Sequence, residues 1–316
     1  MKNEPLFSLT MATYNRAHLL PRAIKSALNQ TYRNFELIII DDASTDNTEY
    51  ICKSFADDRI LYCKQEKNTG VLACRNKAFD LAKGEYIAIL DDDDELLPEA
   101  LETSVKKLVE LSSKGINILW FDRLDFERQE RSGFGISTEG YVRYEDLLCE
   151  RIFGDFWMVI KRELMGEKDR FDERLWGNEG YLWLRLHRKS DAFYVPKVLY
   201  INYREHGAAR LSEAMNRMQN LPRSTLTNRV FLEEHGEELR TRCPKVYGRK
   251  LGIVGASQIL IGNKNEGRKA SLEAFKYHLS IESLTVFLLS YILKGNQILY
   301  ILRNYMKLKQ SLTRRV

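Results

Sequence analysis

Short apolar runs alternate with amphipathic stretches through the first third of the chain. A short apolar run is typical of a strand buried on both faces, and apolar residues three and four apart are typical of a helix that covers one such face. Their alternation predicts a parallel sheet with helices on both sides. The predicted strands are residues 6–11, 36–40, 60–63 and 86–90, and the predicted helices are residues 18–29, 46–55 and 71–82.

The middle of the chain continues this pattern less regularly. Residues 122–150 are polar and mixed, which predicts a hairpin or a flexible loop. One local signal is sharper: Asp46 and Glu49 have the spacing of a capping box at the start of a helix. Further predicted elements are helices at 99–114 and 180–190 and strands at 118–121, 156–160 and 198–203.

From about residue 213 the sequence becomes helical and rich in charge, with few strand signals. Residues 283–302 are strongly apolar, but Lys294-Gly295-Asn296-Gln297 interrupts them, whereas a membrane span needs roughly 20 predominantly apolar residues. Two amphipathic helices fit this stretch better. They could lie on an anionic membrane surface or pack on the first domain, and an amphipathic pattern alone does not separate these alternatives.

Composition indicates a soluble globular chain with a real core. Of 316 residues, 44% are hydrophobic and 29% are charged. The net charge of +5 is too small to indicate a nucleic-acid partner, although every charged residue from Lys294 onward is basic. An odd, scattered set of five cysteines favours free thiols in a reducing compartment, and the N-terminus lacks the apolar stretch of a signal peptide. We therefore expect a cytoplasmic protein, with peripheral attachment to the inner face of the cell membrane as an open alternative.

Candidate chemistry concentrates where the strand at 86–90 runs directly into Asp91-Asp92-Asp93-Asp94. Four carboxylates at the end of a buried strand repel one another and raise their own pKa values unless a cation or a partner neutralises them. The alternative is four solvated acids in a loop. Polar loops also follow the first two strands, at 13–16 and 41–44, and ligands of parallel sheets bind at this edge. The pattern therefore predicts a divalent cation site there.

Five motifs occur in a characteristic order, and together they resemble the family 2 glycosyltransferases of the GT-A fold over roughly residues 5–210. The motifs are Thr13-Tyr14-Asn15-Arg16, Asp41-Asp42-Ala43-Ser44-Thr45-Asp46, Asn68-Thr69-Gly70 with Ala73-Cys74-Arg75-Asn76, Gly84-Glu85-Tyr86-Ile87, and Asp91 to Pro98. The resemblance implies an α/β, Rossmann-like, mostly parallel sheet flanked by helices. It also implies a nucleotide-sugar half at 1–98, an acceptor half at 99–212 and a helical C-terminal region at 213–316.

The resemblance implies roles for individual residues of the donor site. Asp42 matches the position that accepts a hydrogen bond from uracil, so a UDP-sugar is the expected donor. Asp42 could instead belong to a helix-capping cluster. The full set of implied donor-binding residues is Thr13, Tyr14, Asn15, Arg16, Asp42, Arg75, Asp91 and Asp92, of which Asn15 and Arg16 could equally cap a helix.

The same resemblance implies the metal ligands. Alignment on Pro98 makes Asp93 the direct ligand, with Asp91 contributing and His206 as a late third member, although His206 could instead be a structural histidine. Oxygen ligands beside a diphosphate suit Mn²⁺ or Mg²⁺. Because all four positions of the run are Asp, a shift of the register by one residue stays open.

On the acceptor side, relatives carry a Glu-Asp pair just before a Leu-Trp-Leu-Arg helix. Here Asn178-Glu179 precedes Leu182-Trp183-Leu184-Arg185, so the resemblance implies that Glu179 is the general base and that an acidic neighbour is missing. Glu179 could instead be only a helix N-terminal charge. Trp176 is the expected acceptor-side aromatic.

The expected activity is an inverting, metal-dependent transfer of a hexose or N-acetylhexosamine from a UDP-sugar to a hydroxyl of a glycan or lipid-linked acceptor. One alternative is a non-catalytic sugar-nucleotide-binding or scaffold protein, which the missing acid at Asn178 favours. A nucleotidyltransferase is the other, but residues 13–16 lack the glycine-rich phosphate loop that it would need.

Overall fold

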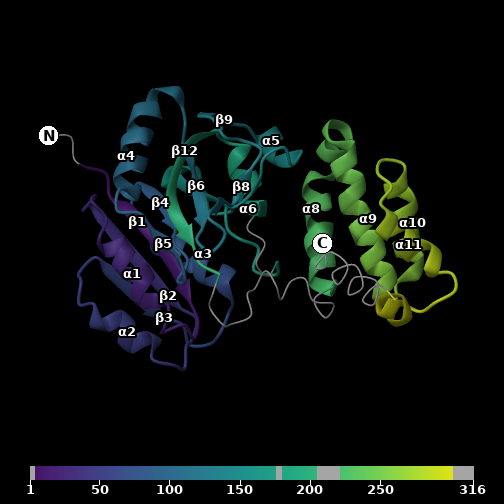
Figure 1. The fold of residues 1–316 in the computed structure, drawn as a ribbon, viewed down its shortest axis with the longest axis horizontal. Helices are drawn as coiled ribbons and strands as arrows, with labels where there is room; N and C mark the ends of the chain where they lie inside the picture. The colour runs from purple at the N-terminus through teal and green to yellow at the C-terminus, as the bar shows by residue number, and fades with distance from the viewer. Residues whose placement is uncertain (1–3, 176–179, 205–220, 302–316) are drawn as a thin grey trace. The chain divides into compact units, whose positions relative to one another are not determined.

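The computed structural model describes residues 4–175, 180–204 and 221–301 (Figure 1). The chain forms two compact units, Met1–Ala208 and Ala209–Val316. The sequence analysis put this boundary after residue 212, which lies among the residues that the structure does not describe.

The first unit is built on one large sheet with the strand order β3-β2-β1-β4-β11-β6-β12-β5. Because β4 and β6 are both antiparallel to β11, the six strands β3, β2, β1, β4, β6 and β12 all run in the same direction. The mostly parallel sheet that was predicted is therefore confirmed. The strands are β1 (Phe7–Thr13), β2 (Phe35–Asp41), β3 (Ile60–Lys64), β4 (Tyr86–Ile89), β5 (Glu95–Leu96), β6 (Ile118–Asp125), β11 (Phe156–Lys161) and β12 (Ala192–Asn202).

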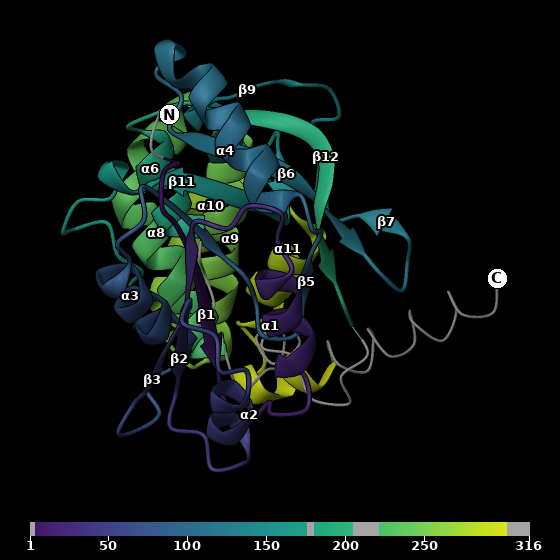
Figure 2. The ribbon, with the colours of Figure 1, turned by 90° about the vertical axis from the view of Figure 1, so that its left-hand side faces the viewer.

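Helices cover both faces of this sheet because its strands are apolar on both sides. In β2, Leu37 and Ile39 pack into one core while Ile38 and Ile40 pack into the other. Figure 2 separates α3 and α6, on the left of β1, from α1 on its right. The first core takes α1 (Leu20–Leu28), α2 (Thr48–Ser54) and α4 (Ala100–Leu111), and the second takes α3 (Val71–Leu81), α5 (Tyr144–Leu148) and α6 (Gly180–His187). Cys52, Cys63 and Cys74 are free thiols, as predicted for these three.

The structure changes two local predictions. The strand predicted at 118–121 continues through Asp125 and pairs antiparallel with β7 (Glu130–Arg131), so of the two alternatives for residues 122–150 the hairpin is confirmed. The rest of this segment holds β8 (Gly133–Phe134), β9 (Gly140–Val142) and α5, which the sequence did not predict. The predicted capping box was wrong: α2 has Asn47 as its N-cap, and Asp46 accepts from Thr48 N at 3.0 Å.

Within its described residues, 221–301, the second unit contains four complete helices, and a further helix begins at Gly295. The predicted interruption of the apolar stretch is real. A Cβ at Gly295 would lie 2.2 Å from the Leu260 carbonyl oxygen, so the chain passes too close to α9 for any other residue. No helix in the described part of the chain is long and apolar enough to cross a membrane. The four helices are α8 (Leu221–Arg242), α9 (Pro244–Leu260), α10 (Lys264–Phe275) and α11 (Ile281–Leu289).

The core of the first unit contains a buried histidine that predicts a pH-dependent stability. His187 is 3% exposed and packs edge-on against Trp120, with ring centroids 5.3 Å apart. Its Nδ1 lies 2.7 Å from the Trp183 carbonyl oxygen, which assigns the N–H to Nδ1. Burial lowers the pKa of His187 to about 4, although this hydrogen bond opposes the shift. The folded state therefore disfavours the protonated ring.

Because the folded pKa of His187 lies below that of the unfolded chain, its contribution to stability is present above the unfolded pKa and is lost as pH falls. We expect this residue to remove about 2 kcal/mol of unfolding free energy between about pH 7.5 and about pH 5. Urea unfolding of His187→Phe should show a pH dependence smaller by this amount. Leu186→Ala is the control, because it should lower stability equally at both pH values. An unchanged pH dependence in His187→Phe would contradict the assignment.

Candidate active site

Loops from two neighbouring strands are tied together at the carboxyl edge of the sheet. Asn15 N donates to Ser44 Oγ at 2.9 Å, and Asn15 Oδ1 accepts from Thr45 N at 2.8 Å. Ala17 N donates to Asp46 Oδ2 at 3.0 Å. Asn15 has a φ of 52°, a left-handed conformation that Asn tolerates better than most residues. Asn15 therefore joins the loop after β1 to the loop after β2, as the predicted convergence requires.

The carboxylate of Asp42 accepts hydrogen bonds from the two residues just before α3. It is 4% exposed, and its two carboxylate oxygens accept from Thr69 N at 2.7 Å and Gly70 N at 2.8 Å. Gly70 has a φ of 92° with open space around its Cα, so glycine is required there by the backbone rather than by crowding. The predicted contact of Asp42 with uracil stays a prediction. A ligand N–H would have to share these oxygens with the backbone N–H groups of Thr69 and Gly70.

Two other predicted donor residues lie beside this loop. Thr13 ends β1, is 3% exposed, and accepts from Asp42 N through its carbonyl oxygen at 2.9 Å. Tyr14 follows with 46% of its side chain surface exposed. Its aromatic face is therefore available to a planar ligand, whereas Thr13 shapes the loop through its backbone.

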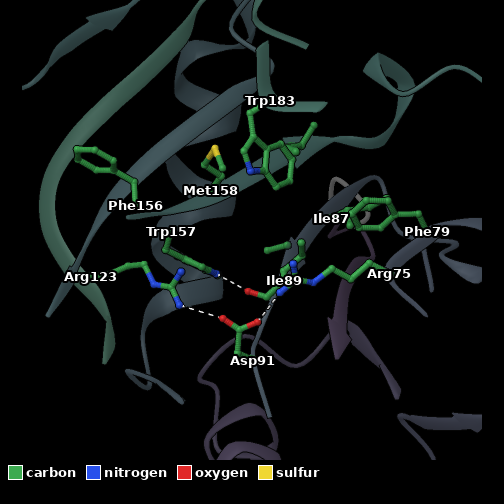
Figure 3. A pocket seen from close by; sticks show the side chains of 12 residues that line it. Arg75, Phe79, Ile87, Ile89, Asp91, Arg123, Phe156, Trp157, Met158 and Trp183 are labelled. Carbon is green, nitrogen blue, oxygen red and sulfur yellow. Dashed lines mark hydrogen bonds and ion pairs between the residues drawn. The ribbon is translucent and has the colours of Figure 1, made fainter. Parts of the chain in front are cut away.

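The aspartates after β4 are neutralised by arginines from three different elements. Asp91 accepts from Arg75 at 2.7 Å and from Arg123 at 3.1 Å (Figure 3). Arg123 also donates to Asp94 at 3.1 Å. The hydroxyl of Tyr200 lies 3.2 Å from an Asp91 oxygen. The run therefore forms an ion-pair network in which Asp92 and Asp94 are buried and Asp91 and Asp93 are half-buried, and it is not a solvated loop.

A second arginine is shared in the same way. The Nη1 atom of Arg16 donates to Asp92 Oδ1 at 2.9 Å and to Asp93 Oδ2 at 2.8 Å. Arg22 donates to the Asp93 carbonyl oxygen and stacks on the Tyr203 ring, 3.6 Å from its centroid. Arg16, predicted to bind the donor or cap a helix, thus neutralises the middle of the acidic run.

Burial and the shared arginines act in opposite directions on the pKa values of the aspartates. Burial raises the pKa of Asp92 to about 6, although Arg16 opposes the shift, and Asp93 adds to it. Burial also raises the pKa of Asp94. Arg123 opposes this shift, and the neighbouring Asp91 and Asp93 add to it. The pKa of Asp91 is lowered because Arg75 and Arg123 together outweigh its loss of hydration. One Arg therefore does not fully compensate two carboxylates, as the sequence analysis anticipated for neighbouring acids.

Arg123 is the site residue that the sequence analysis missed. It lies on β6, stacks on the Tyr200 ring at 3.9 Å, and donates through Nε to Asn202 Oδ1 at 3.1 Å. Its only signal in the sequence was its place two residues beyond the apolar run that ends at Phe121, and we interpreted that place as the start of a loop. Arg123 lies near the end of its strand, where a basic side chain can pair with acidic residues at the same edge of the sheet.

A pocket opens beside Asp91, between α3, α6 and the sheet. Figure 3 shows Asp91 between Arg75 and Arg123 at one end, with Trp183 and Met158 at the other. Charged groups thus meet an aromatic and apolar wall, a combination that suits a sugar ring with one apolar face. The lining residues are Arg75, Phe79, Ile87, Ala88, Ile89, Asp91, Arg123, Phe156, Trp157, Met158, Ile160 and Trp183.

Three predicted site residues lie outside the residues that the structure describes: Glu179, Trp176 and His206. Within the described ranges, no three His, Cys, Asp or Glu side chains are grouped as a metal cage. The donor set that is present, Asp91 and Asp93, offers hard oxygen ligands that fit a divalent cation taking its remaining oxygens from a ligand.

Comparisons with known proteins identify the family of the chain. Residues 8–158 match the model of the glycosyl transferase family 2. A GalNAc(5)-diNAcBac-PP-undecaprenol beta-1,3-glucosyltransferase of Campylobacter jejuni is 36% identical over 200 residues, which cover 62% of this chain and 64% of the relative. The match thus spans slightly less than two thirds of that relative. An uncharacterized glycosyltransferase of Rickettsia typhi is 30% identical over 222 residues, covering 68% of this chain and 69% of the relative.

The fold also resembles a solved structure. Staphylococcus aureus TarS 1-349 in complex with UDP-GlcNAc superposes with a TM-score of 0.60 at 16% identity, covering 92% of this chain and 95% of TarS 1-349. At this identity the likeness speaks for the fold alone. It confirms the expected GT-A architecture with its C-terminal helices.

The position of Arg123 predicts a large stability cost for its removal. Arg123→Met would leave the buried Asp94 without its arginine, which should lower the unfolding free energy by about 3–5 kcal/mol, whereas the half-buried Asp91 keeps Arg75. Urea unfolding at neutral pH measures the change. Arg131→Met is the matched control: Arg131 is 41% exposed, and its partner Asp122 keeps the Tyr194 hydroxyl at 2.9 Å. Equal losses in the two variants would show that Arg123 has no special role.

Proposed function

We propose, from the finding that this chain belongs to glycosyltransferase family 2, that it moves a sugar from a UDP-sugar to a hydroxyl of a glycan or lipid-linked acceptor. The observation that carries the proposal is the meeting of the loops after β1, β2 and β4 around Asp91–Asp94, inside the residues that match the family model. The transfer is proposed to invert the anomeric centre.

The donor would bind along this edge of the sheet. Tyr14 presents an exposed ring for the base, and Asp42, whose N–H donates to the carbonyl oxygen of the preceding Thr13, carries a buried carboxylate. Arg75, only 7% exposed, reaches Asp91 at 2.7 Å and supplies positive charge near the place where a diphosphate would lie. These contacts support UDP as the nucleotide without identifying the sugar.

A divalent cation, Mn²⁺ or Mg²⁺, is proposed as the cofactor, held by Asp93 with Asp91 and with His206 as a further candidate ligand. When bound, it would neutralise negative charge on the departing diphosphate, so no protein acid would be needed there. Arg16 now holds Asp93 Oδ2 at 2.8 Å, so the cation would compete with this guanidinium for the carboxylate. Binding should therefore be weak unless the diphosphate adds its own oxygens.

The proposed chemistry is a single displacement. Glu179 would take the proton of the acceptor hydroxyl, whose oxygen forms a bond to the anomeric carbon while the bond from that carbon to UDP breaks. Attack from the side opposite the leaving group inverts the configuration. The pocket beside Asp91 could hold a sugar against Trp183, because aromatic faces stack on sugar rings.

The acceptor class follows from a relative and not from the geometry. The Campylobacter jejuni relative is named for an undecaprenol-linked substrate, which supports a lipid-linked acceptor here. A non-catalytic sugar-nucleotide-binding protein is the second candidate, because Asn178 replaces the acidic neighbour of the base. Release of UDP in the presence of acceptor distinguishes the two.

Asp93→Asn tests the metal assignment. We expect UDP with Mn²⁺ to raise the melting temperature of the wild type, because a ligand bound only by the folded state stabilises it. The variant should lose the Mn²⁺-dependent part of this rise, and its turnover should fall on the order of a hundredfold. Asp80→Asn, at an acid on α3 paired with Arg170, is the control and should behave like the wild type. A normal Mn²⁺ response in Asp93→Asn would reject Asp93 as a ligand.

Glu179→Gln tests the base. Loss of a general base should cut turnover by about 100-fold or more, whereas the affinity for UDP should stay unchanged because Glu179 is assigned to the acceptor side. Steady-state kinetics and a UDP titration measure the two effects separately. Should the UDP affinity drop in parallel with turnover, the base has to be sought elsewhere.

A further inference from the structure

One side of α11 and of the turn that closes it is apolar and exposed. Ile281, Leu288 and Ile292 expose 81%, 55% and 83% of their side chain surface. Ile281 and Leu288 are seven residues apart and therefore lie on the same side of α11, which ends at Leu289, and Ile292 follows in the turn after the helix. Thr285 falls between them, but its hydroxyl donates to the Ile281 carbonyl oxygen at 2.8 Å. The Thr285 hydroxyl therefore has its hydrogen-bond partner within the helix, and the rest of this side is apolar.

The opposite side of α11 already forms the core of the second unit. Val286, 3% exposed, packs with Ile259 of α9 and with Ile298. Phe287 meets Phe275 of α10 edge-on, with ring centroids 5.5 Å apart. The helix thus has its packing partners within the second unit, and the exposed apolar side is additional to that core. An exposed apolar cluster of this kind usually marks an interaction site.

Positive charge surrounds the end of this surface. Arg268 stacks on the Tyr291 ring at 3.9 Å, and Tyr291 is 61% exposed. Lys264 donates to the carbonyl oxygens of Ser290 and Leu293 at 2.9 Å and 2.8 Å, and Lys294 is exposed. Beyond Glu282 the sequence contains no acidic residue. The basic residues in that stretch are Lys294, Arg303, Lys307, Lys309, Arg314 and Arg315.

We propose that this surface, defined by Ile281, Leu288, Tyr291 and Ile292, docks on an anionic lipid bilayer. Its apolar side chains would enter the headgroup region while the neighbouring cations contact anionic lipids, as in interfacial helices. A second copy of the chain fits less well, because a two-fold interface would bring the same basic groups face to face. The proposal does not depend on the proposed sugar transfer.

The experiment is co-sedimentation of the full chain with vesicles of phosphatidylcholine, with and without phosphatidylglycerol. The wild type should bind the anionic vesicles and lose binding at high salt, because screening weakens contacts with headgroups. The triple variant Ile281→Asn, Leu288→Asn, Ile292→Asn should bind at least about tenfold more weakly, since it removes three apolar side chains from the contact. Val109→Asn is the matched control for Leu288→Asn, because Val109 is 51% exposed on α4.

Several results would overturn the proposal. These are equal binding of the wild type and the triple variant, equal binding to neutral and anionic vesicles, or a wild-type dimer that the triple variant converts to monomers in gel filtration. Leu288→Asn alone, compared with Val109→Asn, repeats the test if the triple variant does not fold. The response of the melting temperature to UDP and Mn²⁺ should be the same in all variants, so that a failure of the proposed transferase function appears separately.

Discussion

The site depends on one electrostatic constraint: four carboxylates stand at the end of a buried strand and must be neutralised. The structure meets it with arginines that arrive from separate parts of the first unit. Arg16 comes from the loop after β1, Arg75 from α3 on one face of the sheet, and Arg123 from β6. Because each of these elements must be in place before the acids can be buried, the ion-pair network links the N-terminal half of the unit to its second half.

The network also explains why much of the surrounding structure is polar yet buried. Asp94 accepts from Tyr203 N at 3.0 Å, and Asp91 N donates to the Tyr200 hydroxyl at 3.0 Å, so the end of β12 is fixed against the acidic run. Trp157 donates to the Ile89 carbonyl oxygen at 3.0 Å and supports the last residue of β4. The pocket beside Asp91 is therefore shaped by side chains that also hold the acids in place.

The sequence predicted the sheet and the position of the site because both depend on local signals. The sequence itself contains the alternation of strands and helices and the acidic run after residues 86–90. Arg123 was missed because its partners are 29 and 32 residues away, and only the strand order makes β6 a near neighbour of Asp91 and Asp94. The absent capping box at Asp46 has a similar cause: its second oxygen holds Ala17 N, a contact across loops that no spacing rule anticipates.

Within the acidic run, Asp92 lowers the stability of the fold at neutral pH. A carboxylate whose pKa is raised in the folded state stabilises the fold below its unfolded pKa and loses that contribution as pH rises through the folded value. For Asp92, with a folded pKa of about 6, the loss at neutral pH is on the order of 3 kcal/mol. An amide at that position would avoid it and could still accept from Arg16. Stability alone therefore does not account for an aspartate at this position, whereas a cation bound at this edge would reduce the repulsion between Asp92 and Asp93 that adds to the cost.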